Sequence, residues 1–391
     1  SNLGLSYTDA FFEAMSGVTT TGSTVITGLD TAPPGILLWR ALLQWLGGIG
    51  IIVMAISILP LLQVGGMQLF RMESSDSSDK AFPRVAQISA ATAIIYVVLT
   101  LICAIAMWTA GMTPFEAAAH SMTTIATGGF STSDASIGHF DSAYMDWIVI
   151  IFMILGSLPF VLYFAMIRGN PRALVRDTQV QWFLITVVVS IIMIAVWLVT
   201  KNDMAMWHAV RLSSFNVVSI ITGTGYASAD YNAWGVLPVT AFFFFMFIGG
   251  CAGSTSCGIK IFRYQILFAN ARVQFRRMWQ PNVVYSPRYN HKPIPESVTD
   301  AVMSFFFMFA LVFGILALAL TLIGLDFMTA VSGAATAIAN VGPALGSTIG
   351  PSGTFAPLPD AAKWVLSIGM LLGRLELFTV LVLFSPAFWR A

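Results

Sequence analysis

Charged side chains are scarce in this chain of 391 residues, because Asp, Glu, Lys and Arg together make up only 9% of it. Soluble domains average about 25% charged residues. Hydrophobic residues make up 57% of the chain, and the mean hydropathy is +0.82. The composition therefore excludes an ordinary soluble protein and predicts an all-α polytopic membrane protein. The net charge of +1 gives no reason to expect a nucleic-acid partner.

Cysteine and histidine are also rare. The three cysteines (Cys103, Cys251 and Cys257) lie in apolar segments, and the four histidines are scattered. This pattern favours neither a disulfide framework nor a zinc site. The stretch "GSTS" (253–256) contains serines, but no histidine or aspartate is placed to activate them. We therefore do not expect an enzyme.

Long apolar runs dominate the chain, and seven of them reach the roughly 20 residues that cross a bilayer. They cover residues 36–62, 86–110, 142–167, 181–199, 235–268, 298–323 and 361–388. Four shorter segments, 7–18, 114–125, 203–220 and 326–338, are too short or too polar to span. Each is followed by a loop rich in Gly, Thr and Ser and then by a long run. The sequence therefore predicts four short helices that enter the membrane part of the way.

The four polar loops form an internal repeat. They read "TTTGST" (19–24), "ATGGFST" (126–132), "TGTGYAS" (222–228) and "ANVGPALGS" (339–347). In register, Gly22, Gly129, Gly225 and Gly342 recur at intervals of roughly a hundred residues. We expect four pseudo-symmetric units of span, half-helix, loop and span, at 1–62, 86–167, 181–268 and 298–391. The first unit lacks its leading span, so we expect the natural N-terminus to lie upstream.

Basic residues indicate the orientation. Fourteen of the 19 Lys and Arg fall on one side: Arg71, Lys80, Arg84, Arg168, Arg172, Arg176, Lys260, Arg263, Arg272, Arg276, Arg277, Arg288, Lys292 and Arg390. The positive-inside rule makes that side cytoplasmic, with connecting loops at 63–85, 168–180 and 269–297. The glycine loops then face outward, which in a bacterium is the periplasm.

Acidic residues gather on the outer side. Six aspartates follow the glycine loops, with Lys363 as the one basic counterpart: Asp30, Asp134, Asp141, Asp146, Asp230 and Asp360. They either solvate the loops or form an acidic mouth that concentrates cations.

Start signals support the short helices. In "TPFE" (113–116), Thr113 is placed as the N-cap, Pro114 in the first turn and Glu116 in the capping-box position. Asp9, Asp203 and Asp326 are placed to open the other three. We expect Glu13 and Glu116 to cap or orient helices and not to bind ions.

The loops have the chemistry of a cation filter. A dehydrated cation needs rings of backbone carbonyls in place of water, and glycine tolerates the backbone conformations that such rings require. A short helix that enters the membrane also aims its partly negative C-terminal end at the centre. The expected filter residues are Thr20, Thr21, Gly22, Ala126, Thr127, Gly128, Gly129, Thr222, Gly223, Thr224, Gly225, Asn340, Val341 and Gly342.

With these four loops, the chain resembles the Trk/Ktr/HKT superfamily of potassium transporters over its whole length, and most closely the bacterial TrkH-type transmembrane subunits. The resemblance implies potassium uptake across the bacterial inner membrane through a single-chain, pseudo-fourfold pore, with K⁺ as the bound ion. It also implies a homodimer in membrane lipid and a cytoplasmic TrkA-like regulatory ring that binds ATP, ADP or NAD(H). Glycine at position 22 resembles the potassium-selective members, since serine there goes with sodium selectivity in the plant branch.

The fifth long run is expected to break. Its residues 249–258 contain four glycines, two serines and one threonine, which disfavours a regular helix; the alternative is a small-residue face for helix packing. The resemblance implies an intramembrane gating loop beneath the filter. The expected gate residues are Gly249, Gly250, Cys251, Ala252, Gly253, Ser254, Thr255, Ser256, Cys257, Gly258 and Arg374.

Arg374 lies in the middle of the last long run. A charge at the bilayer centre costs about 3 kcal/mol on insertion scales, so this arginine should face the pore or pair. Glu376 is two residues away and would point elsewhere on a helix. The resemblance implies a place near the gating loop, and the alternative is an ion pair with Glu13 or Glu116.

The alternative class of function is an ion-coupled secondary transporter. Ion-coupled secondary transporters also use broken helices, but they usually show two repeats, not four. They also tend to carry ionisable residues along the transport path, whereas Arg374 is the one clear mid-span charge in this sequence. The sequence therefore favours a filter and a gate, and it leaves open whether transport is passive or coupled to protons or sodium.

Overall fold

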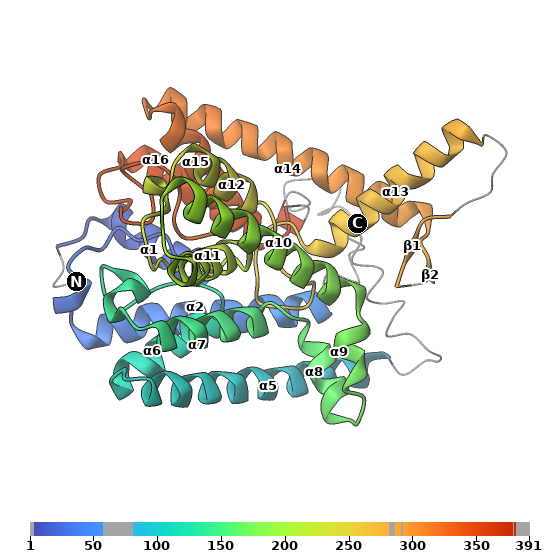
Figure 1. Cartoon of the computed structure of the whole chain (residues 1–391), viewed down its shortest axis with the longest axis horizontal. Coiled ribbons are helices and arrows are strands. Elements are labelled where there is room, and N and C mark those ends of the chain that lie inside the picture. The colour runs from blue at the N-terminus through green and yellow to red at the C-terminus, as the bar shows by residue number, and fades with distance from the viewer. Residues whose placement is uncertain (1–3, 58–80, 281–285, 291, 378, 381–391) are drawn as a thin grey trace, which may run out of the picture.

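The computed structural model describes residues 4–57, 81–280, 286–290, 292–377 and 379–380. It is built from helices, with several long ones running in roughly the same direction across the body (Figure 1). The short strands β1 (Arg288–Tyr289) and β2 (Lys292–Pro293) form an antiparallel hairpin. The prediction of an all-α polytopic membrane protein is confirmed. Most of the connecting loop expected at 63–85, with Arg71 and Lys80, lies outside the described residues, as does Arg390.

Four helices in the described residues are long and apolar enough to cross a membrane. They are α2 (Pro34–Ser57), α5 (Ala81–Thr109), α10 (Thr178–Lys201) and α14 (Glu296–Leu322). A fifth candidate, the pair α7 (Ala143–Gly156) and α8 (Phe160–Ile167), is bent by 91°. Pro159 lies at this bend, and the backbone N–H of Phe160 donates to the carbonyl of Gly253 at 3.0 Å. The long run expected over 142–167 is therefore present as a bent pair of helices and not as one straight helix.

Two other predicted runs also depart from straight spans. The run 235–268 is divided into α12 (Val236–Phe245) and α13 (Ile261–Trp279), with the expected break between them. The last run begins with α16 (Asp360–Arg374), so Arg374 lies at the end of a helix and not in its middle. Glu376 and Leu377 then take φ of 62° and 41°. Residues 378 and 381–388 of that run, and residues 58–62 of the run 36–62, lie outside the described residues.

The four predicted short helices are present. They are α1 (Tyr7–Val18), α6 (Pro114–Ile125), α11 (Met206–Ile221) and α15 (Phe327–Ala339). Short connecting helices are η1 (Leu29–Thr31), η3 (Ser136–Phe140), α9 (Arg172–Arg176) and η4 (Tyr231–Trp234).

Two of the four start signals are confirmed. The capping box of Thr113 and Glu116 is formed, and Asp326 accepts a hydrogen bond from the Thr329 N–H at 3.1 Å. Two were wrong. Ser6 caps α1, with Asp9 in the first turn, and α11 begins after Ala205 without a side-chain cap. The N-cap of α1 is Ser6, three residues before Asp9. Asp203 has a left-handed backbone (φ 50°) and lies two residues before the N-cap position of α11.

The short helices occupy the interior and join the long ones into a closed arrangement. Three of them pack against the long helix that precedes them, as α6 does with α5, α11 with α10 and α15 with α14. They also contact the neighbouring part of the chain: α6 packs on α2, α11 on α7 and α1 on α16. The C-terminal ends of the short helices therefore meet in the buried centre of the molecule.

Candidate functional site

The four glycine loops touch one another in a closed ring. A Cβ added to Gly22 or Gly129 would overlap a backbone carbonyl oxygen of the next loop, so the backbones themselves are in contact. The contacts run from Gly22 to Gly128, Gly129 to Thr224, Gly225 to Gly342, and Gly342 back to Gly22. Each loop thus borders the next, and the fourth borders the first.

The loops also share one backbone conformation at the end of each short helix. The residue two positions before each register glycine is left-handed: Thr20 (φ 53°), Thr127 (50°), Gly223 (77°) and Asn340 (52°). In the first loop the Thr20 N–H donates to the Gly17 carbonyl at 3.0 Å and the Thr21 N–H to Ser16 at 2.9 Å. This is the Schellman arrangement. It ends the helix sharply and turns the chain into the ring.

The register glycines themselves are of two kinds. Gly22, Gly129 and Gly225 have φ of 89°, 77° and 82°, a region that favours glycine. The φ of Gly342 lies outside that region. Gly342 precedes Pro343, and a residue before proline is biased toward extended backbone. The fourth loop therefore joins the same ring with a different local geometry.

Buried polar side chains fix the ring. Gln44 of α2, fully buried, donates to the Gly128 carbonyl at 2.6 Å and accepts from the Phe130 N–H at 3.0 Å. The Asn340 amide donates to Thr21 Oγ1 at 3.0 Å and to the Met370 carbonyl at 2.8 Å. Sequence reasoning missed Gln44, although an amide in an otherwise apolar run was a usable signal.

A cavity of about 280 Å³ opens above the ring, and all four register glycines line it. Arg40 of α2 lies in its wall, and its guanidinium bonds Glu13 Oε1 and the Ser131 carbonyl at 2.8 and 2.9 Å. Arg40 therefore ties the first loop to the second, and sequence reasoning also missed it. Glu13 orients this arginine and accepts from the Val25 N–H, as expected for a structural carboxylate.

Several of the six outer aspartates have structural partners. Asp141 and Asp146 pair with Arg211 of α11 at 3.4 and 2.6 Å. Asp134 accepts from the backbone N–H groups of Gly28 and Leu29 at 2.9 and 3.1 Å. The expectation that Lys363 is the one basic counterpart was wrong, because Arg211 lies on a short helix that was not counted with the loops. Lys363 itself pairs with Asp9.

The break at 249–258 lies directly on the inner side of the ring. The Thr255 hydroxyl donates to the carbonyls of Ile125 and Gly156, both at 2.9 Å. Cys257 Sγ lies 3.4 Å from Thr20 Oγ1, and a Cβ on Gly223 would lie 3.3 Å from the Cys257 nitrogen. The segment therefore touches the first and second repeats as well as the loop of the third repeat, to which it belongs. The alternative of a regular helix with a small-residue face was wrong.

Hydrogen bonds to neighbouring backbone hold the same segment in place. The Cys251 N–H donates to the Ser157 carbonyl at 3.0 Å, and the Ala252 N–H to Gln179 Oε1 at 3.0 Å. The two ends of the segment are joined by a bridge between Ile248 and Ile259. The break is thus a defined loop with specific partners.

Arg374 lies against this segment. Its guanidinium donates to the Thr255 carbonyl at 3.2 Å, to Cys257 Sγ at 2.6 Å and to the Gly47 carbonyl at 3.0 Å. The alternative ion pairs were wrong, because Glu13 pairs with Arg40 and Glu116 caps α6.

Two further basic residues are buried near the segment. Lys260 donates to the Ser256 carbonyl, and Arg263 pairs with Glu376. From the sequence, both are expected among the basic residues of the cytoplasmic loops and tails, whereas the structure buries them at the start of α13. Arg263 also lies 3.7 Å over the ring of Phe305. The pair with Glu376 joins α13 to the chain just after Arg374.

The wider comparisons agree with this architecture. The family model described as "TrkH: Cation transport protein" matches residues 1–391. A Trk system potassium uptake protein TrkI of Halomonas elongata is 52% identical, over 99% of this chain and 78% of its own length. TrkH of Escherichia coli is 41% identical, over 99% of this chain and 80% of its own.

A solved structure has the same fold. The crystal structure of the potassium transporter TrkH from Vibrio parahaemolyticus superposes with a TM-score of 0.90 at 39% identity, covering 99% of this chain and 80% of that one. The family is one of transporters and not of enzymes. The chain belongs to the TrkH family of cation transport proteins.

Proposed function

We propose that this protein carries potassium ions across the bacterial inner membrane through the ring of four glycine loops. The observation that carries the proposal is the closed ring itself, in which Gly22, Gly129, Gly225 and Gly342 come together under one cavity. Irregular backbone at this depth is acceptable in a membrane protein where it is buried or lines a pore. The relatives named as potassium uptake proteins point to the same ion.

The filter is formed by the loop residues expected from the sequence, Thr20–Gly22, Ala126–Gly129, Thr222–Gly225 and Asn340–Gly342. Carbonyl oxygens from four loops replace the water shell of K⁺. Each of the units 1–62, 86–167, 181–268 and 298–391 supplies one quarter of the ring.

The segment 249–258 and Arg374 form the gate on the inner side. Residues of the other three repeats contact the segment, and the arginine, from the fourth repeat, donates to two of its residues. A positive charge on the path of a cation repels it, by roughly 4 kcal/mol at 4 Å and an effective dielectric of about 20. Movement of the segment removes this barrier.

The assembled form is a homodimer, with the basic loops on the cytoplasmic side and the ring toward the periplasm. A TrkA-like nucleotide-binding ring docks on the basic side and moves the gate. The support is the one-sided distribution of Lys and Arg and the naming of the relatives as parts of a Trk system.

The test is ion flux in proteoliposomes that contain the purified protein. A K⁺ gradient should produce a diffusion potential close to the K⁺ equilibrium value, and an equal Na⁺ gradient should produce a smaller one. Equal potentials for the two ions would reject a K⁺ filter. No ion flux in liposomes that contain well-folded protein would reject a conducting pathway in the isolated subunit.

A further inference from the structure

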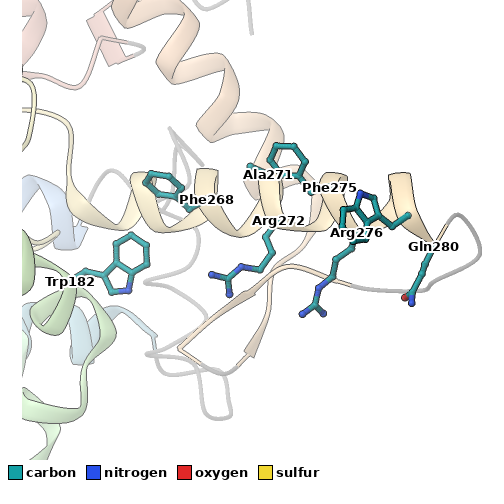
Figure 2. A pocket seen from close by; sticks show the side chains of 8 residues that line it. Trp182, Phe268, Ala271, Arg272, Phe275, Arg276 and Gln280 are labelled. Carbon is teal, nitrogen blue, oxygen red and sulfur yellow. The ribbon is translucent and has the colours of Figure 1, made fainter.

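A groove of about 750 Å³ runs along the C-terminal part of α13, with Trp182 of α10 at one end, away from the ring (Figure 2). Its walls carry the aromatic rings of Trp182, Phe268 and Phe275. Two arginines, Arg272 and Arg276, extend from the side of α13 on which Trp182 lies (Figure 2). The groove thus combines a large apolar wall with a pair of cationic groups.

The two helices that contribute residues to the groove, α10 and α13, are joined beside it. The Gln265 side chain on α13 donates to the Thr178 carbonyl at the start of α10, at 2.8 Å. One turn further along α13, the rings of Trp182 and Phe268 are 5.8 Å apart. The two helices therefore open from a hydrogen-bonded junction, and the groove is part of the fold.

The charge of the groove has one sign. Arg272 and Arg276 are four residues apart on one helix, so they lie on the same face. None of the lining residues is acidic, and the chain has no Asp or Glu between residues 264 and 295. The nearby Asp177 carboxylate is engaged with the N–H groups of Gln179 and Val180 at the start of α10.

One end of the groove lies near the start of a candidate membrane span. Trp182 lies in the second turn of α10, a candidate membrane span, and tryptophan is enriched at the boundary between lipid and water. Phe268 is 57% exposed and Phe275 69% exposed, so apolar surface is open to the surroundings beside Trp182 and further along α13. Along α13, Phe268 precedes the two arginines, Phe275 lies between them and Trp279 follows them.

We propose that this groove binds an anionic phospholipid, with a fatty acyl chain along Trp182 and Phe268 and the phosphate between Arg272 and Arg276. Guanidinium groups bind phosphate oxygens through paired N–H groups, and basic pockets between membrane helices suit anionic headgroups. The shape and charge together fit a lipid with one negative headgroup. A soluble phosphate has no apolar part that would contact the aromatic side chains of the groove.

The test uses the full-length protein reconstituted in vesicles that carry a trace of photoreactive phosphatidylglycerol, followed by peptide mapping. Cross-links should concentrate in residues 178–190 and 265–280, and unlabelled phosphatidylglycerol should compete while phosphatidylcholine does not. The double variant R272Q/R276Q should lose labelling about thirtyfold, since each surface arginine adds about 1 kcal/mol. R272K/R276K should retain most of it.

The matched control for the single variants R272Q and R276Q is Arg277→Gln, which removes one positive charge from the same part of α13 but does not line the groove. Its labelling should stay within about twofold of the parent protein. A loss in Arg277→Gln equal to that in the single variant R272Q or R276Q would overturn the proposal in favour of a diffuse charge effect. Equal labelling by a photoreactive phosphatidylcholine would reduce the groove to an unspecific apolar surface.

Two other occupants give distinct results. Full competition by 10 mM inorganic phosphate (roughly ten-thousandfold above 1 μM) would contradict a lipid and indicate a soluble anion. Labelling that is seen for monomers and is absent from isolated dimers would contradict it too, because a second copy of the chain would then cover the groove.

Discussion

The ring of glycine loops and the segment beneath it are built in opposite ways. The ring is assembled from one element repeated four times, and neighbouring backbones contact each other at Gly22, Gly129 and Gly225. The segment 249–258 occurs once, and side chains such as Thr255 and Arg374 hold it in place. A repeated contact that excludes even a Cβ suits a fixed set of ion ligands. A segment that occurs once and is held by a few side-chain hydrogen bonds suits a part that moves.

This difference leads to separable functions. Changes in the ring should alter which ion passes, and changes in the segment should alter how much passes.

The largest effect is expected from Arg374→Ala. Removing the guanidinium releases the Thr255 carbonyl and Cys257 and removes a positive charge from the inner side of the ring. K⁺ flux should rise, by up to about three orders of magnitude if the charge is unscreened, with the K⁺/Na⁺ ratio unchanged. Flux assays in proteoliposomes measure both quantities.

The matched control for that change is Arg374→Lys, which keeps the charge and should leave the flux close to that of the parent protein. A fall in flux for Arg374→Ala at normal folding would contradict the gate, since it would mean that the arginine holds the pathway together.

The next effect concerns the ring. Gly129→Ala places a Cβ onto the Thr224 carbonyl oxygen at a φ of 77°, and a left-handed alanine alone costs about 1–2 kcal/mol. The K⁺/Na⁺ permeability ratio should fall by at least about tenfold. Bi-ionic potentials measure the ratio, and an unchanged value would remove Gly129 from the filter.

A third prediction concerns the link between α13 and the gate. Glu376→Gln leaves the Arg263 guanidinium, which is fully buried, without its carboxylate. Breaking one side of a buried pair costs about 3–5 kcal/mol, so thermal unfolding should begin at a lower temperature. Replacing both residues, as in R263M/E376M, should recover much of that loss; a double variant as unstable as the single one would argue against the pair.

The smallest effect is expected in the fourth loop. A Cβ on Gly342 would lie 3.1 Å from the Thr21 carbonyl oxygen, and the backbone carries no left-handed strain. Gly342→Ala should therefore change the permeability ratio by less than about threefold. A loss as large as that of Gly129→Ala would show that four-way contact matters more than local conformation.

Much of this arrangement could be predicted from the sequence, because it repeats. Four loops with a glycine in register predicted four short helices and their meeting point, and helix start signals such as Thr113 and Glu116 placed α6 correctly. The clustering of small residues at 249–258 predicted a broken helix, since glycine and serine support neither a lipid-facing surface nor a regular span.

The rest depends on contacts that sequence spacing does not record. Gln44 and Arg40 looked like exceptions within an apolar run, but they bridge loops that are about ninety residues away. The bend between α7 and α8 arises where Phe160 meets the carbonyl of Gly253. Arg374 was assigned to a continuous helix because the residues around it are apolar, whereas the helix ends there.

The most direct test is a bi-ionic recording of Gly225→Ala and Arg374→Ala, side by side in the same lipid bilayer. Gly225 borders the fourth loop, where a Cβ would lie 2.7 Å from the Gly342 nitrogen. The account predicts a lower K⁺/Na⁺ permeability ratio for Gly225→Ala, and a larger K⁺ current at an unchanged ratio for Arg374→Ala. A changed ratio in both variants, or in neither, would contradict the division between a selective ring and a movable gate.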